Sequence, residues 1–272
     1  MLLALLLSYP YEGEVVLWLG PNWTPEGKIV FLEEREVQAG HEDKYIATLC
    51  QIDRDGSNLT RIVRFSNYIP PTSGVFTAAT DSLVIVSTGA QMFLVERKTG
   101  KLLKDLGQGA YANFSPDGKR IVYQKYEGYS PKGIWVMDLE SGRERCLVPD
   151  TDATYPDWSP SGKYIVYDVC PRWDFARTFI VDTLGNLVYD SLPYLEAPDW
   201  SWRTDSLLIG AGDRGIVILH LPARKVEALS FQGLESRWSP DGKWLIIFTV
   251  HDGFRGYLVV NKEGTNWVPL CP

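Results

Sequence analysis

One short pattern occurs four times in this sequence and constrains the fold more than any other feature. An aromatic residue is followed by Ser or Thr, Pro, a mostly polar residue and Gly, and then by an apolar run. The copies are NWTPEGKIVF at 22–31, NFSPDGKRIVY at 113–123, DWSPSGKYIVY at 157–167 and RWSPDGKWLII at 237–247. Because an enzyme needs a single active site, a segment repeated four times indicates a structural unit rather than a catalytic signature.

Each copy has the chemistry of a β-hairpin. Ser or Thr suits the first position of a type I turn, Pro presets φ at the second, and Gly takes the left-handed conformation at the fourth. The apolar run that follows, such as residues 121–123, is typical of a strand buried on both faces. Each copy therefore predicts a short strand that ends in the aromatic residue, a tight turn and a buried second strand.

Two weaker copies extend the series. FTAATDSLVI at 76–85 and WSWRTDSLLI at 200–209 have lost the Pro and the Gly of the turn but sit where the spacing predicts a copy. The six aromatic residues that would anchor the copies recur every 38 to 53 residues, at Trp23, Phe76, Phe114, Trp158, Trp200 and Trp238. A period of this size is typical of a repeat architecture.

The second half of each repeat has a common pattern as well. A strand runs into a polar turn, as in GIWVMDLESG at 133–142, and a short fourth strand follows, as at 145–148 or 226–229. Four antiparallel strands repeated six times predict an all-β, six-bladed β-propeller, whose sheets stack face to face around an axis. We expect the anchoring aromatic residues to fill the space between neighbouring blades.

The hairpin followed by IWVMDLESG resembles the WD40-like repeat of TolB-type six-bladed propellers, most closely over residues 114–142. The pattern covers about residues 21–270, so we expect one propeller domain at 21–272, without the separate N-terminal domain of TolB. Trp-Asp at 173–174 does not recur, which separates the chain from true WD40 proteins. The resemblance implies a protein-binding scaffold in the periplasm or outside the cell.

The chain ends are expected to close the ring. Residues 1–20 would form a tail whose strand at 14–19 (EVVLWL) pairs beside the strands of residues 238–270. Sharing one sheet between the two ends would protect otherwise open strand edges. The alternative is that residues 266–270 close the last blade alone while residues 1–19 lie outside the ring.

Composition excludes several classes of protein. A net charge of −7 argues against nucleic-acid binding, which relies on Lys and Arg, and no run of 18 apolar residues predicts a membrane-spanning helix. LLALLL at 2–7 is too short for a signal peptide, although it could be the remnant of a longer one. The chain is expected to be monomeric.

Metal and catalytic motifs are not recognisable. The four cysteines, Cys50, Cys146, Cys170 and Cys271, lack zinc-site spacing. Cys50 and Cys146 are expected to be buried in strands. Whether any two of the cysteines form a disulfide is left open by the sequence. Among the three histidines, His220 is expected in the core. GYSPKG at 128–133 misses G-x-S-x-G, and Asp53 and Asp55 indicate a turn rather than a calcium loop. We expect no enzyme activity, metal or cofactor.

Binding residues are therefore sought on one face of the ring. The second turns, at 33–44, 126–132, 170–177 and 251–255, are expected to be irregular loops, and such loops often bind partners. At the rim we select Arg172, Trp173, His251 and Arg255. On the same face, the residue before each anchoring aromatic should point into the central channel. These residues are Asn22, Asn113, Asp157, Asp199 and Arg237, with Val75 as the apolar exception.

Several alternatives remain open at this point. The mouth could recognise a small molecule or a glycan, or the chain could be a degenerate hydrolase or lyase propeller. It could also be a sensor or assembly piece of a larger envelope complex. Finally, the loops could be merely solvated and the channel could hold only water.

Overall fold

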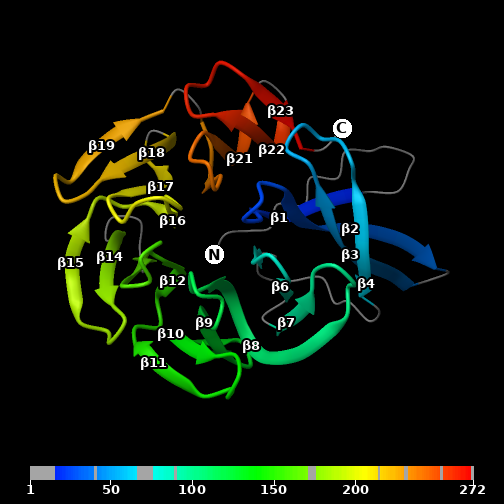
Figure 1. The fold of residues 1–272 in the computed structure, drawn as a ribbon, viewed down its shortest axis with the longest axis horizontal. Helices are drawn as coiled ribbons and strands as arrows, with labels where there is room; N and C mark the ends of the chain where they lie inside the picture. The colour runs from blue at the N-terminus through cyan, green and yellow to red at the C-terminus, as the bar shows by residue number, and fades with distance from the viewer. Residues whose placement is uncertain are drawn as a thin grey trace.

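The computed structural model describes residues 16–39, 42–65, 76–88, 91–170, 176–213, 215–229, 232–251 and 254–270. All the regular structure in these residues is β-strand, and the sheets form a ring around a central axis (Figure 1). No helix in this part of the chain is long and apolar enough to cross a membrane. The expected all-β class is therefore confirmed.

The strands fall into five antiparallel sheets. The first sheet contains β1 (Val16–Trp23), β2 (Ile29–Ala39), β3 (Glu42–Ile52) and β4 (Thr60–Phe65). The second contains β5 (Phe76–Ala79), β6 (Leu83–Thr88), β7 (Gln91–Glu96), β8 (Leu102–Phe114), β9 (Arg120–Glu127), β10 (Ser130–Asp138) and β11 (Glu144–Val148).

The other three sheets have four strands each, in chain order. They are β12 (Ala153–Trp158), β13 (Tyr164–Val169), β14 (Arg177–Asp182) and β15 (Leu187–Leu192); β16 (Glu196–Trp200), β17 (Leu207–Gly212), β18 (Gly215–His220) and β19 (Lys225–Ala228); and β20 (Glu235–Trp238), β21 (Trp244–His251), β22 (Phe254–Asn261) and β23 (Trp267–Pro269).

The seven-stranded sheet differs from the expected set of separate four-stranded blades. Its strand β8 pairs with β7 up to Gln108 and with β9 from Gly109 onward. No turn interrupts the chain between these two residues, so the outer strand of one repeat continues directly as the inner strand of the next. The described residues therefore form five sheets, and the count of six blades stays a prediction.

The predicted hairpins are confirmed where the Pro-x-Gly pattern is complete. After β8, the amide of Ser115 donates to Arg120 O at 2.8 Å, and the amide of Gly118 donates to Ser115 O at 2.8 Å. Gly118 has a φ of 67°, the left-handed conformation that the turn requires. The middle residues of the following strand, 121–124, are all buried. Equivalent turns follow Trp23, Trp158 and Trp238.

Four of the anchoring aromatic residues fill the space between sheets, as expected. Trp23, Trp158, Trp200 and Trp238 are at most 4% exposed. Trp238, for example, packs with Ile209 and Ile218 of the preceding sheet. At about 25 cal/mol per Å², the burial of about 150–250 Å² contributes about 4–6 kcal/mol per ring as an upper bound.

The second repeat departs from this pattern. Its turn is closed by the amide of Thr80, which donates to Leu83 O at 2.9 Å. The residue before this turn is Ala79, which pairs with Val84, whereas Phe76 lies three residues earlier, opposite Ser87. The prediction of Phe76 as an anchor was therefore wrong, because Ala79 occupies the position before the turn. The two weak copies share the segment Thr-Asp-Ser-Leu, but the turn is shorter in the second repeat than in the fifth.

Ring closure also differs from the prediction. Strand β1 pairs with β2, with Leu19 opposite Leu32, and β23 completes the last sheet by pairing with β22. Trp23 packs with Val259 and Leu270 of the last sheet, and its Nε1 donates to Arg237 O at 3.2 Å. Face-to-face packing therefore joins the ends, and the last blade closes alone as in the alternative, but residues 16–19 lie in β1 of the first sheet rather than outside the ring. Residues 1–15 lie outside the described residues.

Three of the expected irregular loops belong to regular hairpins, including the one at 251–255, where His251 pairs with Phe254. Strand β2 continues to Ala39, and only Gly128 and Tyr129 separate β9 from β10. The charged residues at 33–44 suggested a loop, but Glu33 is 1% exposed and paired with Arg35 and Arg61. The charge is thus compensated within the sheet rather than by water.

Two smaller expectations were also wrong. Cys146 is exposed, although Cys50 is buried as predicted. His220 is not a core residue, because it is partly exposed and lies 3.0 Å from the carboxylate of Glu227 on the outer strand β19.

Candidate functional site

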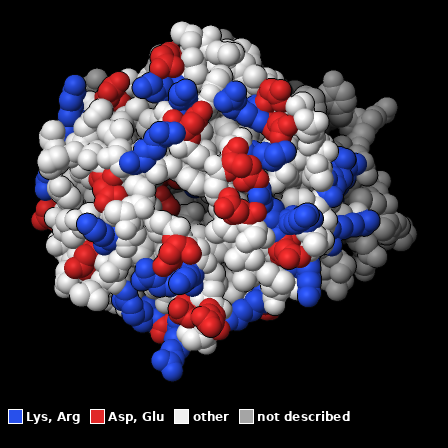
Figure 2. Space-filling model, in the orientation of Figure 1, with Lys and Arg blue, Asp and Glu red and all other residues white. Residues whose placement is uncertain are grey.

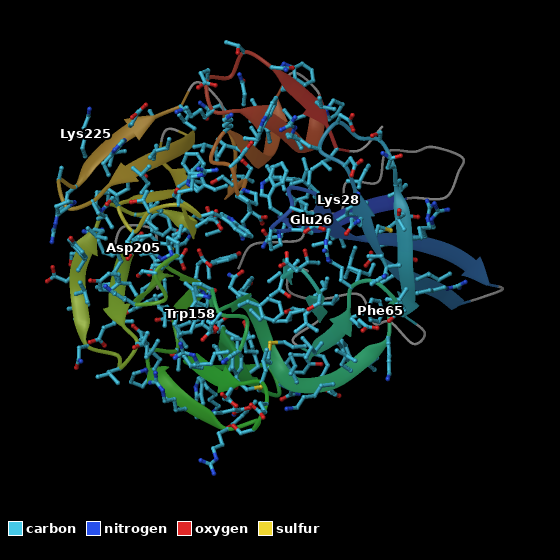
Figure 3. The ribbon with its side chains drawn as sticks, viewed as in Figure 1. Glu26, Lys28, Phe65, Trp158, Asp205 and Lys225 are labelled. Carbon is cyan, nitrogen blue, oxygen red and sulfur yellow. The ribbon has the colours of Figure 1, made fainter. Side chains whose placement is uncertain are left out.

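A cavity of about 570 Å³ lies at the centre of the ring. Its walls are the first turns of the repeats, including Pro25, Pro116, Pro160 and Trp202. Figure 2 shows a hollow at the centre of the ring with acidic side chains beside it. In Figure 3, Glu26 of a first turn lies toward the centre, whereas Lys225 of β19 lies at the outer edge. We call this space the mouth cavity.

The mouth cavity opens on the face opposite to the one predicted. We expected its polar residues on the face of the second turns, but first turns enclose them. The reason follows from the strand direction. Except for Phe76, each anchoring aromatic residue ends its strand at the first turn, so the residue before it lies just below the first-turn face.

Four of the five predicted channel residues line the mouth cavity: Asn22, Asn113, Asp157 and Asp199. Arg237 lies beneath them and lines a narrow space of about 10 Å³ together with Tyr111 and Tyr155. Val75, the predicted exception, falls outside the described residues. The equivalent position in the second repeat is Ala78, which pairs with Ile85 as Asn22 pairs with Val30. We call Asn22, Asn113, Asp157 and Asp199 the floor residues.

The floor residues connect neighbouring sheets by hydrogen bonds. Asn113 Nδ2 donates to Pro156 O at 3.0 Å, and Asn22 Nδ2 donates to Thr77 O at 2.9 Å. The two aspartates accept instead. Asp157 Oδ2 accepts the backbone amide of Trp200 at 2.9 Å, and Asp199 Oδ2 accepts that of Trp238 at 2.8 Å. Sequence reasoning placed these side chains in the channel but missed their role in joining the sheets.

Arg237 belongs to the same network. Its guanidinium donates to Ala197 O at 3.2 Å and to Ser236 O at 2.9 Å. Its positive charge also acts on both floor carboxylates. Arg237 is thus held by backbone carbonyls below the floor, where it balances part of the buried negative charge.

Burial changes the acidity of the two floor aspartates. Together with the neighbouring carboxylate of Asp199, it raises the pKa of Asp157 to about 8, against the opposing effects of Arg237 and of the backbone amides that Asp157 accepts. Burial also raises the pKa of Asp199, to about 6, against the opposing effect of Arg237. At neutral pH, Asp157 is therefore mostly protonated and Asp199 mostly ionised.

A bulge recurs two residues before each floor residue. Gly20, Tyr111, Tyr155 and Ala197 have φ angles of 56°, 56°, 49° and 49°, and the strand register shifts beside each of them. The left-handed conformation costs an L-residue about 1–2 kcal/mol. The sequence signal was the local pattern GPN, YAN, YPD and APD, which sequence reasoning did not use.

The bulges bring two rings together in the channel. Tyr111 and Tyr155 have centroids 4.2 Å apart with their planes tilted by 41°. Burial raises the pKa of both phenols, so both stay neutral. These rings line the narrow space below the floor, so the mouth cavity narrows sharply at their level.

Three further carboxyl groups, Asp168, Glu196 and Glu235, are buried or partly buried, and burial raises the pKa of each. Asp168 Oδ2 accepts the amide of Ala197 at 3.2 Å, and Tyr257 donates to Glu235 at 3.3 Å. Among the described residues, no group of three or more His, Cys, Asp or Glu could hold a metal ion.

None of the predicted rim residues is among the described residues that line the mouth cavity. Arg172 and Trp173 lie outside the described residues. The backbones of His251 and Arg255 belong to the β21–β22 hairpin, at the second-turn end of the last sheet, and their side chains are not among those described. A rim at the second turns and a cavity at the first turns lie on opposite faces.

No family model and no curated protein matches the sequence. Solved structures do match. TolB from Acinetobacter baumannii is 16% identical with a TM-score of 0.51, over 92% of this chain and 53% of that chain. A chain of a nidogen/laminin complex is 14% identical with a TM-score of 0.60, over 94% of both chains. A puromycin hydrolase mutant is 16% identical with a TM-score of 0.63, over 94% of this chain and 46% of that chain.

These likenesses concern the fold. At 14–16% identity, shared architecture does not carry over an activity. The chain spans about half the length of the TolB and hydrolase chains that it matches. One of these neighbours is named as an enzyme and another as part of a protein complex.

Proposed function

We propose that this chain, which has a TolB-like β-propeller fold, is a non-enzymatic scaffold that binds a segment of a partner protein in its mouth cavity. The observation that carries the proposal is the cavity itself. It measures about 570 Å³, is central, and has a polar floor. That volume lies within the range of about 300–1,000 Å³ that is usual for ligand sites, and it can take one or two side chains of an extended segment.

The rigidity of the floor supports binding. Each floor residue is fixed by a hydrogen bond to the next sheet, and the neighbouring tryptophans are buried between sheets. A site whose side chains are already held in place loses little conformational entropy when it binds a partner. A site merely filled with water would not require such precise connections.

The blade count belongs to the same proposal. We count the seven-stranded sheet as two blades that share β8, since β8 changes partner between Gln108 and Gly109. The ring then has six blades, in agreement with the six sequence repeats. The monomeric state and the periplasmic or extracellular location implied by the resemblance also remain proposals.

A small molecule or glycan is the second candidate ligand, because the cavity volume suits one. Sugars commonly stack on open aromatic faces. Phe114 and Trp202 are partly exposed at the cavity, but Trp23, Trp158 and Trp200 are at most 4% exposed, so three of its five aromatic rings offer little surface. This burial favours a protein segment. A hydrolase role is less favoured because both floor aspartates already accept backbone amides from the next sheet.

The test is to block the mouth cavity with a bulky side chain and to measure the affinity for a partner. Ser82 is exposed and lines the mouth cavity, so Ser82→Trp should block entry. Leu184, 78% exposed in the β14–β15 turn, lies on the same face at the outer edge, so Leu184→Trp is the matched control. A partner identified by pull-down and mass spectrometry should bind the wild type and Leu184→Trp with equal affinity, and Ser82→Trp at least about tenfold more weakly. Equal affinity for all three proteins would place the site elsewhere.

A further inference from the structure

The charges around the mouth cavity are of one sign. Four aspartates line it, namely Asp81, Asp117, Asp157 and Asp199. None of the described residues that line it is Lys, Arg or His. A concave site lined by one sign of charge and bordered by low-dielectric walls focuses its potential on a ligand of the opposite sign.

Two basic side chains near the mouth cavity are engaged with other groups. Arg237, below the floor, is bonded to the carbonyls of Ala197 and Ser236. Arg120 lies 3.9 Å from Asp117, at the outer limit of an ion pair, and its guanidinium lies over the ring of Trp158. Neither residue lines the mouth cavity, so a ligand that enters it meets carboxyl groups first.

These carboxyl groups keep capacity to accept further hydrogen bonds. Asp199 accepts one backbone amide of the next sheet through Oδ2, whereas an ionised carboxylate offers about four acceptor positions. Asp81 is exposed at the cavity edge, and its backbone carbonyl, rather than its carboxylate, accepts from Arg97. Acceptors therefore line the path from the edge to the floor.

From this arrangement we infer that the mouth cavity binds a cationic side chain, a Lys ammonium or an Arg guanidinium carried on an extended segment of the partner protein. The inference rests on the proposed function and specifies the chemistry of its ligand. The cation would pass Asp81 and Asp117 at the edge and reach the floor, where it would pair with Asp199 and favour the ionised form of Asp157. An ammonium or guanidinium supplies only donors, and the floor supplies acceptors.

The aromatic walls have a secondary role. Trp158 and Trp200 are 4% and 3% exposed and present little of their rings, so they act mainly as a low-dielectric wall rather than as an aromatic cage. In such surroundings a charge pair is stronger than in water. Selectivity should therefore follow the charge of the ligand more than its apolar surface.

The test uses four capped pentapeptides of the form Gly-Gly-X-Gly-Gly, in which X is Lys, Arg, norleucine or Glu. Capping removes the terminal charges, so X carries the only charge. Their dissociation constants are measured by isothermal titration calorimetry against the full chain. We expect the Lys and Arg peptides to bind about tenfold or more tightly than the norleucine peptide, and the Glu peptide to bind most weakly.

Variants assign the effect to the floor. Asp199→Asn keeps an amide oxygen for the Trp238 amide and should remove most of the preference for Lys over norleucine, because it removes the floor carboxylate that is ionised at neutral pH. Asp152→Asn, at an exposed aspartate outside the cavity, should leave the preference unchanged.

The outcomes separate this inference from the proposed function. If the peptides bind the wild type but not Ser82→Trp, and norleucine binds as tightly as Lys, the mouth is the site and the cationic ligand is wrong. If Ser82→Trp binds every peptide like the wild type, or if no peptide binds the wild type, both claims are overturned. An equal loss of preference in Asp152→Asn and Asp199→Asn would also overturn the inference.

Discussion

Replacing Asp157 with Asn should stabilise the protein at alkaline pH more than at acidic pH. Burial raises the pKa of Asp157 to about 8 in the folded protein, whereas an unfolded aspartate titrates near ~3.9. As the pH rises, the unfolded chain releases this proton first, so the folded state loses stability from about pH 4 to about pH 8 and is level above that. At about 1.36 kcal/mol per pKa unit, the loss between pH 5 and pH 8 is about 3 kcal/mol.

Asparagine has no proton to release in this range, and its side-chain oxygen can still accept the amide of Trp200. The free energy of unfolding of Asp157→Asn, minus that of the wild type, should therefore rise by about 3 kcal/mol between pH 5 and pH 8. Urea denaturation at both pH values measures this difference, with Asp152→Asn as the exposed control. A difference that is the same at both pH values, or that falls as the pH rises, would refute the reasoning.

Two further predictions rest on the contacts between sheets, and a third rests on the missing nucleophile motif. Asn113→Asp should be destabilised by about 1–3 kcal/mol near neutral pH in urea denaturation, because a carboxylate cannot donate to Pro156 O. The loss should be smaller at pH 4, where a protonated carboxyl can donate, and an equal loss at both pH values would contradict this. Trp238→Ala should lose about 3–5 kcal/mol by the same assay, since it leaves a cavity between sheets, and a loss below about 1 kcal/mol would contradict the packing. Hydrolysis of p-nitrophenyl acetate should be the same for the wild type and Ser130→Ala, and activity abolished by this substitution would establish a nucleophile.

The hairpins and the inter-sheet tryptophans were predictable because their signals are local. A Ser-Pro-x-Gly turn and an apolar run need only neighbouring residues to specify them, as the turn at Ser115–Gly118 shows. The alternation of side chains along a strand was enough to place Asn22, Asn113, Asp157 and Asp199 in the channel. Those parts of the structure depend on short stretches of chain.

The remaining features depend on contacts between distant segments. The bond from Asp157 to the amide of Trp200 joins residues 43 positions apart, and no local pattern indicates which neighbour a channel side chain will meet. The same holds for Glu33, whose burial depends on Arg61 of another strand. The face on which the mouth cavity opens was predicted wrongly, although the sequence contains the information. The aromatic residue ends the first strand at the first turn, so the polar residue before it must lie near the first-turn face.

Hydrogen–deuterium exchange on the complex with a captured partner tests the central claim most directly. The binding site is proposed to lie at the first turns, so backbone amides at 80–83, 115–118 and 160–163 should exchange more slowly in the complex than in the free protein. Amides of the second-turn hairpin at 126–131, on the opposite face, should be unchanged. Slower exchange confined to 126–131 and the β21–β22 hairpin, with no change at the first turns, would contradict the account.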